Sequence, residues 1–132
     1  MTVRLKVRTR MDPRKLRHQT QRANIQSLGH AAAAIRLVAR RSIKRRKRKS
    51  PEGQPPHTRR GQLKRAILYS VDKEKGQAVI GPDESIVGTA GAAHEHGGPY
   101  KGERYRKRPF MGPALEQIKP RLPKLWRGSV RS

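Results

Sequence analysis

The sequence has little of what most folded domains use to build a core. Its 132 residues include no cysteine, one phenylalanine and one tryptophan, and 33% of them are hydrophobic. The absence of cysteine excludes disulfide bonds and thiolate metal sites, and it fits a reducing compartment. A chain of this length has room for one domain. We expect its single core to be thin and aliphatic, or to be shared with neighbouring subunits.

Acidic residues are also scarce. The chain has 33 Lys and Arg against 9 Asp and Glu, which gives a net charge of +24. Of these basic residues, 17 fall within residues 1–50, where Asp12 is the only acid. Self-repulsion of this size opposes compaction of an isolated chain. We therefore expect a polyanion or acidic partner subunits beside the protein in its working state.

Long apolar runs are missing as well. No stretch approaches the roughly 20 apolar residues that cross a bilayer. The first ten residues, MTVRLKVRTR, lack the apolar centre of a signal peptide. We expect a soluble protein, made in a cytoplasm, with no membrane partner.

The first half of the chain predicts a strand followed by a long helix. In residues 1–12, apolar Val3, Leu5 and Val7 alternate with basic residues, which indicates a half-buried strand or arm. Asp12 and Pro13 are typical of a helix start. The helix is predicted over 13–45, with Gly29 as a bend or a point of close backbone approach. Its apolar face recurs at steps of three and four: Ile25, Leu28, Ala32, Ile35, Ala39 and Ile43.

The second half predicts a small sheet between two basic loops. Residues 46–61 are rich in proline and basic side chains and form a loop. Residues 62–100 are predicted to form an antiparallel sheet, with a hairpin turn at Lys75–Gly76 and a third short strand around 85–90. The small residues that follow this strand are expected to turn into a helical corner. A second basic loop covers 101–110, and a C-terminal helix and tail cover 111–132, with prolines at 120 and 123 disturbing the helix. The fold class is α+β, a long N-terminal helix packed on a small antiparallel sheet with a short C-terminal helix, in one domain.

One segment, His94–Glu95–His96, gathers side chains that could bind metal or transfer protons. A metal site here would need a third ligand brought close in space, such as His57 or Asp83. The alternative is structural, with these side chains stabilising a tight turn beside Gly97–Gly98. We favour the structural interpretation. We predict no catalytic residues, no metal at His94 and His96, and no cofactor.

Two basic clusters are the stronger candidates for a binding surface. They consist of Lys44, Arg45, Arg46, Lys47, Arg48 and Lys49, and of Lys101, Arg104, Arg106 and Lys107. Such clusters can contact phosphates, with binding that falls steeply as salt rises. Reading of bases is not expected, because nothing indicates a groove-reading element and aromatic platforms for single strands are few. A merely solvated loop and a nuclear-localisation signal are the alternatives for 44–49.

Three sequence segments, in this order along the chain, resemble the motifs of a known protein family. They are PPHTRRGQLKRAI at 55–67, VGTAGAAHEHGG at 87–98 and RPFMGPAL at 108–115. Over roughly residues 11–118 the chain resembles the small neck or tail-completion proteins of tailed bacteriophages. The residues that match the family motifs are Pro56, Thr58, Gly61, Leu63, Glu95, Gly97, Arg108, Pro109 and Phe110. The glycine after Glu95 comes one position late, behind His96, which departs from the family pattern.

Each matched motif also has a structural interpretation. Thr58 can cap the short helical turn that Gly61 and Leu63 continue. The Arg108–Pro109–Phe110 element would bury the single Phe. None of these roles is catalytic.

The resemblance implies a structural virion protein and not an enzyme. Its subunits would form a homo-oligomeric ring at the head–tail junction, around the DNA channel, after synthesis in the bacterial host cytoplasm. Its partners would be adjacent connector, terminator or tail-tube proteins, with nonspecific contact to packaged DNA. The alternative function is a sequence-nonspecific nucleic-acid-binding protein, which the charge alone indicates.

Overall fold

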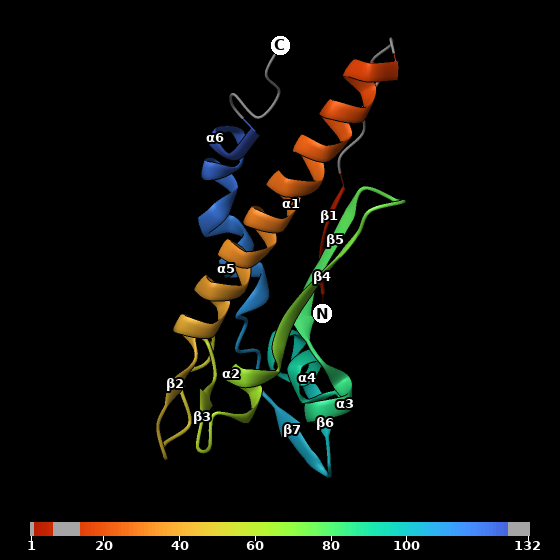
Figure 1. The fold of residues 1–132 in the computed structure, drawn as a ribbon. Coiled ribbons are helices and arrows are strands. Elements are labelled where there is room, and N and C mark those ends of the chain that lie inside the picture. The colour runs from red at the N-terminus through yellow and green to blue at the C-terminus, as the bar shows by residue number, and fades with distance from the viewer. Residues whose placement is uncertain (1, 7–13, 127–132) are drawn as a thin grey trace.

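A long helix lies between a small sheet and two short helices. The computed structural model describes residues 2–6 and 14–126. Helix α1 (Arg14–Ser42) runs along one antiparallel sheet, which has the strand order β1 (Val3–Lys6), β5 (Gln77–Pro82) and β4 (Ile67–Asp72). Helices α5 (Met111–Ile118) and α6 (Leu122–Trp126) follow its other flank (Figure 1). The predicted fold class is confirmed.

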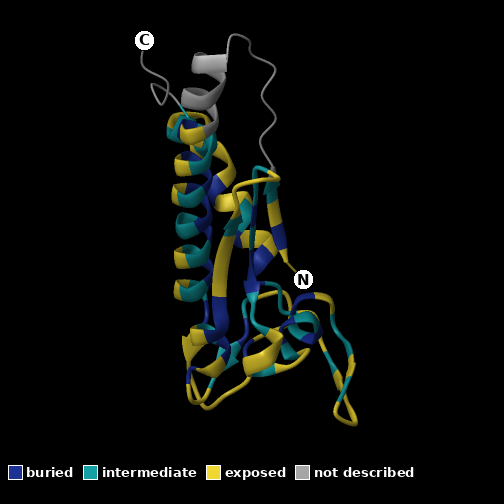
Figure 2. Cartoon of the chain, turned by 45° about the vertical axis from the view of Figure 1, so that its right-hand side comes forward, coloured by how far each residue is buried: buried dark blue, intermediate teal, exposed yellow. Residues whose placement is uncertain are grey.

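The core face of α1 is the apolar stripe expected from the sequence. Leu28, Ala32, Ile35 and Ala39 are fully buried, and Ile25 is partly buried against the same cluster. At about 1.5 Å of rise per residue, the 29 residues of α1 span roughly 44 Å. Figure 2 shows the buried segments gathered between α1 and the sheet. Because so many of these side chains are alanine, α1 can approach the strands closely.

The sheet has one covered face and one open face. Ile67, Tyr69 and Val71 of β4 pair with Pro82, Ile80 and Ala78 of β5. This face packs on α1 through buried residues such as Ile67 and Ile80, while Tyr69 at the edge of the sheet is exposed. Leu68, Ser70 and Asp72 point the other way and are exposed. Arg4 of β1 pairs with Val79 and lies on that same open face. One covered and one solvated face is the usual arrangement of an antiparallel sheet.

The free edge of β4 is partly protected by α1. The main-chain oxygen of Ile67 points away from β5, and Arg36 of α1 donates its Nε–H to this oxygen at 2.8 Å. Asp83, just after β5, donates its backbone N–H to the oxygen of Ala66 at 2.9 Å. The first residues of β4 therefore have partners on both sides. The rest of the edge, including Tyr69, is more open.

The short elements cluster at the C-terminal end of α1. They are β2 (Lys44–Arg45), β3 (His57–Thr58), α2 (Gln62–Ala66), α3 (Glu84–Val87), α4 (Ala90–His96), β6 (Gly98–Tyr100) and β7 (Glu103–Tyr105). Strands β2 and β3 pair in parallel, and β6 and β7 form a hairpin. The chain then enters α5, a 3₁₀ turn η1 (Lys119–Arg121) and α6. The hydroxyl of Ser27 donates to the main-chain oxygen of Leu125 at 2.9 Å and holds α6 against α1.

Three boundaries predicted from the sequence are wrong. Helix α1 ends at Ser42 and not at 45, because Lys44 and Arg45 leave the helix to pair with His57 and Thr58. For the same reason the predicted loop 46–61 contains a strand. The predicted loop 101–110 begins inside a hairpin, whose tip residue Lys101 has a positive φ of 49°.

The predicted third strand around 85–90 is also wrong. This segment forms α3 and the start of α4, and the third strand of the sheet is β1. The helical corner expected in the small residues after it is confirmed by α4. Asp83 caps α3 by accepting hydrogen bonds from the backbone N–H and the hydroxyl of Ser85, which lower the pKa of Asp83. The hairpin of β4 and β5, the strand at Val3–Lys6 and the helix break before Pro120 are confirmed. The predictions for Val7, Asp12–Pro13 and the tail 127–132 fall outside the described residues.

Candidate functional site

The two basic clusters, far apart in the sequence, meet at one end of the molecule. Glu52 pairs with Arg106 at 3.4 Å, and Gly53 donates its backbone N–H to the oxygen of Lys107 at 2.8 Å. Arg108 donates its Nε–H to the oxygen of Ser50 at 2.8 Å. These contacts join the loop after β2 to the segment after β7. We call this region the basic end and define it by its exposed cations: Lys44–Lys49, Arg59, Arg60, Lys101, Arg104, Arg106 and Lys107.

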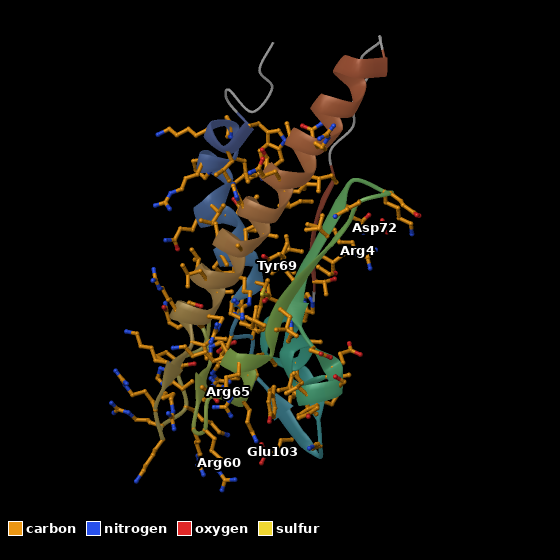
Figure 3. The ribbon with its side chains drawn as sticks, in the orientation of Figure 1. Arg4, Arg60, Arg65, Tyr69, Asp72 and Glu103 are labelled. Atoms are coloured by element: carbon orange, nitrogen blue, oxygen red, sulfur yellow. The ribbon has the colours of Figure 1, made fainter. Side chains whose placement is uncertain are left out.

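Local backbone contacts shape the 44–61 part of the basic end. Arg46 donates its N–H to the oxygen of Thr58 at 3.2 Å, and His57 donates from Nδ1 to the oxygen of Arg48 at 2.8 Å. The Thr58 hydroxyl accepts the N–H of Gly61 at 3.1 Å, as expected for a cap of the turn before α2. Gly61 adopts a φ of 76°, which favours glycine. Arg60 and Arg65 project from this same end (Figure 3).

Little negative charge offsets the basic end. Its acidic neighbours are Glu52 and Glu103, both exposed. In the part of the chain that the structure describes, the ion pairs are Arg106 with Glu52 and Lys119 with Glu116, between well-exposed side chains. Such exposed pairs contribute little to stability. The other guanidinium groups with hydrogen bonds, such as those of Arg46 and Arg65, donate to main-chain oxygens, which leave their charge uncompensated.

A cavity of about 380 Å³ opens within the basic end. Lys49 and His57 line it from the 44–61 segment, and Arg104, Arg106 and Arg108 line it from the other. Ser50 is 3% exposed and also lines the cavity, although its Oγ has no hydrogen-bond partner. The cavity therefore combines several cations with a buried hydroxyl.

His94 borders the same cavity and is held in a neutral state. Its ring lies 5.1 Å from that of Tyr105, and its Nδ1 is buried without a partner. Burial, and then the nearby charge of Arg108, lowers the pKa of His94 from its ordinary value of 6.5. Its backbone oxygen accepts the N–H of Arg108 at 2.6 Å. The imidazole is therefore uncharged at neutral pH.

Glu95 caps the start of α5. Its side chain is buried, and Oε1 accepts the backbone N–H groups of Phe110 at 3.1 Å and Met111 at 2.8 Å. Oε2 accepts the N–H of Gly112 at 3.3 Å, and Pro113, the next residue, has no N–H. The first intrahelical bond follows at Ala114. Every donor that the first turn of α5 leaves free is thus satisfied by one carboxylate.

The interpretation of 94–96 as structural agrees with this geometry. His94 packs against Tyr105, Glu95 is committed to α5, and His96 is exposed at the end of α4. Among residues 2–6 and 14–126, no group of three or more His, Asp or Glu side chains is placed to hold a metal ion. Neither His57 nor Asp83 joins the two histidines as a third ligand in such a group.

The remaining motif residues are packing residues. Phe110 is fully buried, as predicted, and Leu63 is buried in the same core cluster. Pro56 is also fully buried. Gly97 has a φ of 74°, and a Cβ there would lie 3.1 Å from the backbone oxygen of Tyr105. Pro109 precedes Phe110 on the path into α5 and is partly buried.

Several residues of this region were not predicted from the sequence to belong to the site. Ser50 gives no signal, because a lone serine beside a proline is typical of any loop. Arg59 and Arg60 could have been added to the basic cluster, since they are two adjacent cations in the same predicted loop. Gly91 was missed as the point of closest approach: a Cβ there would clash with the ring of Pro82 and contact Phe110 at 3.7 Å.

Comparison with protein-family models, curated proteins and solved structures finds no match to this chain. Within the described ranges, none of the helices combines the length and apolar character that crossing a bilayer requires.

Proposed function

We propose that this chain is a structural virion protein of a tailed bacteriophage. It is a neck or tail-completion subunit that assembles as a ring around the DNA channel at the head–tail junction. The observation that carries the proposal is that the three segments resembling this family meet in one place. Leu63 and Ile67 of the first segment share the core cluster with Phe110 of the third, and Glu95 of the second segment caps α5 at Phe110.

The polar groups of these segments support a structural role. The carboxylate of Glu95 is occupied by backbone donors of α5. The backbone of His94 is bonded to that of Arg108, which fixes α4 against the entrance to α5. Both oxygens of this carboxylate are therefore engaged in capping a helix, which is a structural role.

The basic end suits contact with DNA that passes through a channel. Its cations are exposed and come from two loops and a hairpin, so they form an area and not a single groove-reading element. Such an area binds the sugar–phosphate backbone without reading bases. In a ring with this end toward the lumen, each subunit would contribute the same cations to the channel wall.

Exposed apolar side chains offer surfaces for the neighbouring subunits. Leu37 on α1 is 43% exposed, and Leu68 and Tyr69 on the edge strand β4 are 40% and 42% exposed. Exposed apolar residues on an unpaired edge are a common site of association. We assign this edge to contacts within the ring, and other faces to adjacent connector, terminator or tail-tube proteins.

The proposal is tested by disrupting the gene in a phage that encodes the chain and imaging the lysate by negative-stain electron microscopy. We expect heads and tails that are formed but not joined, and rescue by the wild-type gene supplied in trans. Rescue by Leu68→Lys should fail, whereas the matched Ser70→Lys on the same face of β4 should succeed. Normally joined particles in the absence of the gene would refute the proposal.

The second candidate function is a sequence-nonspecific nucleic-acid-binding protein. The convergence of the two basic clusters at one end favours it. It predicts tight binding of duplex DNA by the isolated chain, with normal particle joining in the disrupted phage. The microscopy experiment therefore distinguishes the two functions.

A further inference from the structure

The cavity of the basic end is built by fixed contacts and not by loose side chains. Arg108 is held by the main-chain oxygens of Ser50 at 2.8 Å and Arg106 at 3.4 Å. Its own backbone N–H is bonded to His94. These bonds tie the wall after β7 to the loop after β2 and to α4. Arg108 is only partly exposed, so its position is set by the fold.

The charge of this wall is only partly neutralised from within, because Arg106 pairs with Glu52 at 3.4 Å whereas the other lining cations have no carboxylate partner among the described residues. Both hydrogen-bond acceptors of the Arg108 side chain are neutral carbonyl oxygens. Lys49 and Arg104 also line the cavity, and no hydrogen bond or ion pair joins either side chain to another described residue. Glu103 is the one carboxylate on the lining, and it is exposed. A partly enclosed group of cations that outnumbers its carboxylates attracts an anion.

Two buried polar atoms at the cavity also lack partners in the described chain. They are Oγ of Ser50 and Nδ1 of His94. Leaving such a group without a hydrogen bond is destabilising, and buried polar atoms in folded proteins nearly always have a partner. A hydroxyl and an imidazole are both able to donate a hydrogen bond to an oxyanion.

We propose that this cavity binds a phosphate group. Guanidinium groups bind phosphate through several charge-assisted hydrogen bonds, and phosphate offers more acceptor oxygens than a carboxylate does. The volume of about 380 Å³ is open enough for a phosphate that stays attached to a nucleic-acid backbone. The site is therefore specific for the anion and indifferent to the base sequence. It rests on the cavity alone and holds whether or not the chain is a neck protein.

Two binding measurements on the full chain distinguish free phosphate from backbone phosphate. Inorganic phosphate is titrated at constant ionic strength while the amide resonances of Ser50, His94 and Arg108 are followed by NMR. A duplex of random sequence is titrated in parallel by fluorescence anisotropy over a salt series. Arg104→Gln is the cavity variant. Arg46→Gln, at the same end but off the lining, and Arg121→Gln, on η1, are matched controls with the same loss of charge.

We expect saturable shifts with inorganic phosphate in the wild type and in Arg121→Gln. Binding should be roughly tenfold weaker in Arg104→Gln, a difference of about 1.4 kcal/mol, because one charge-assisted hydrogen bond is lost. For the duplex, Arg104→Gln should reduce the salt slope by about 1 and weaken binding more than Arg46→Gln does. If Arg104→Gln weakens binding only in the phosphate titration, the site binds free phosphate. If it weakens binding in both titrations, the site binds the phosphates of a nucleic-acid backbone.

Ser50→Ala separates binding from folding. Removing a buried hydroxyl that has no partner should leave the free energy of unfolding unchanged or raised, while phosphate binding weakens. The proposal is overturned if Arg104→Gln and Arg121→Gln bind phosphate equally. It is also overturned if a polyglutamate peptide, and not phosphate, shifts the three resonances.

Discussion

Replacing Glu95 with alanine tests the link between α4 and α5 directly. The substitution removes the acceptors of three backbone N–H groups, at Phe110, Met111 and Gly112. Phe110 and Met111 are 0% and 2% exposed, so water cannot easily replace the lost oxygen. The helix also loses a negative charge at its positive end.

The expected destabilisation follows from these contacts. A buried donor left without a partner costs about 1–3 kcal/mol, and loss of a helix cap costs about 1 kcal/mol. With two buried donors, we expect Glu95→Ala to lower the free energy of unfolding by about 3 kcal/mol. This is a large share of the roughly 5–15 kcal/mol that stabilises a domain. Glu95→Gln keeps one acceptor oxygen but loses the charge, and should cost about 1–2 kcal/mol.

Chemical denaturation followed by circular dichroism measures these differences. Glu116→Ala on α5 is the matched control, because the Glu116 side chain is 70% exposed and pairs only with exposed Lys119. We expect the control to stay within about 0.5 kcal/mol of the wild type. The reasoning is refuted if Glu95→Ala and Glu95→Gln are no less stable than Glu116→Ala.

Three further predictions concern packing and protonation. Gly91→Ala should destabilise the fold by about 1–3 kcal/mol, because its Cβ clashes with the ring of Pro82. Gly29→Ala should stabilise the fold by about 0.5–1 kcal/mol, since nothing lies within 4 Å of the added Cβ. Equal changes in the free energy of unfolding for the two variants would contradict the close packing at Gly91. Arg36→Met should cost about 1–3 kcal/mol by leaving the oxygen of Ile67 unpaired, and an unchanged denaturation midpoint would contradict this. The lowered pKa of His94 predicts that stability is kept above pH 6.5 and lost as pH falls from 6.5 through the folded-state pKa. His94→Phe should reduce this loss between pH 7.5 and pH 5, and an equal loss in both chains would argue against a neutral buried imidazole.

Periodicity predicted the parts of the fold that bury one regular face. The alternation at Val3 and Leu5, the helical stripe through Leu28 and Ile35, and the hairpin around Gly76 all appear in the structure. The strand expected around 85–90 failed, because a capping Asp83 and a run of small residues form two short helices there. Helices this short depend on tertiary contacts, which a local pattern does not reveal.

The candidate site was predictable in its residues but not in its assembly. The run Lys44–Lys49 and the cations at 101–107 are evident from composition. Their convergence depends on long-range bonds, such as Arg108 to Ser50, between residues 58 positions apart. The role of Glu95 has the same origin, since its partners lie 15 to 17 residues further along the chain.

Gly29 illustrates the same limit on a smaller scale. In the sequence it is interpreted as a bend or a point of close approach. The structure shows α1 continuing through it with open space where a Cβ would be. The close approach occurs instead at Gly91, whose partners Pro82 and Phe110 come from other parts of the chain.

The most direct test of the proposed function is a cryo-electron microscopy reconstruction of the head–tail junction of a phage that encodes this chain. The account predicts a ring in which each subunit fits α1 lying between the three-stranded sheet and α5, with the basic end facing the DNA in the lumen. A junction without such a ring would contradict the proposed function. A ring with the basic end turned away from the DNA would contradict the proposed role of its charge.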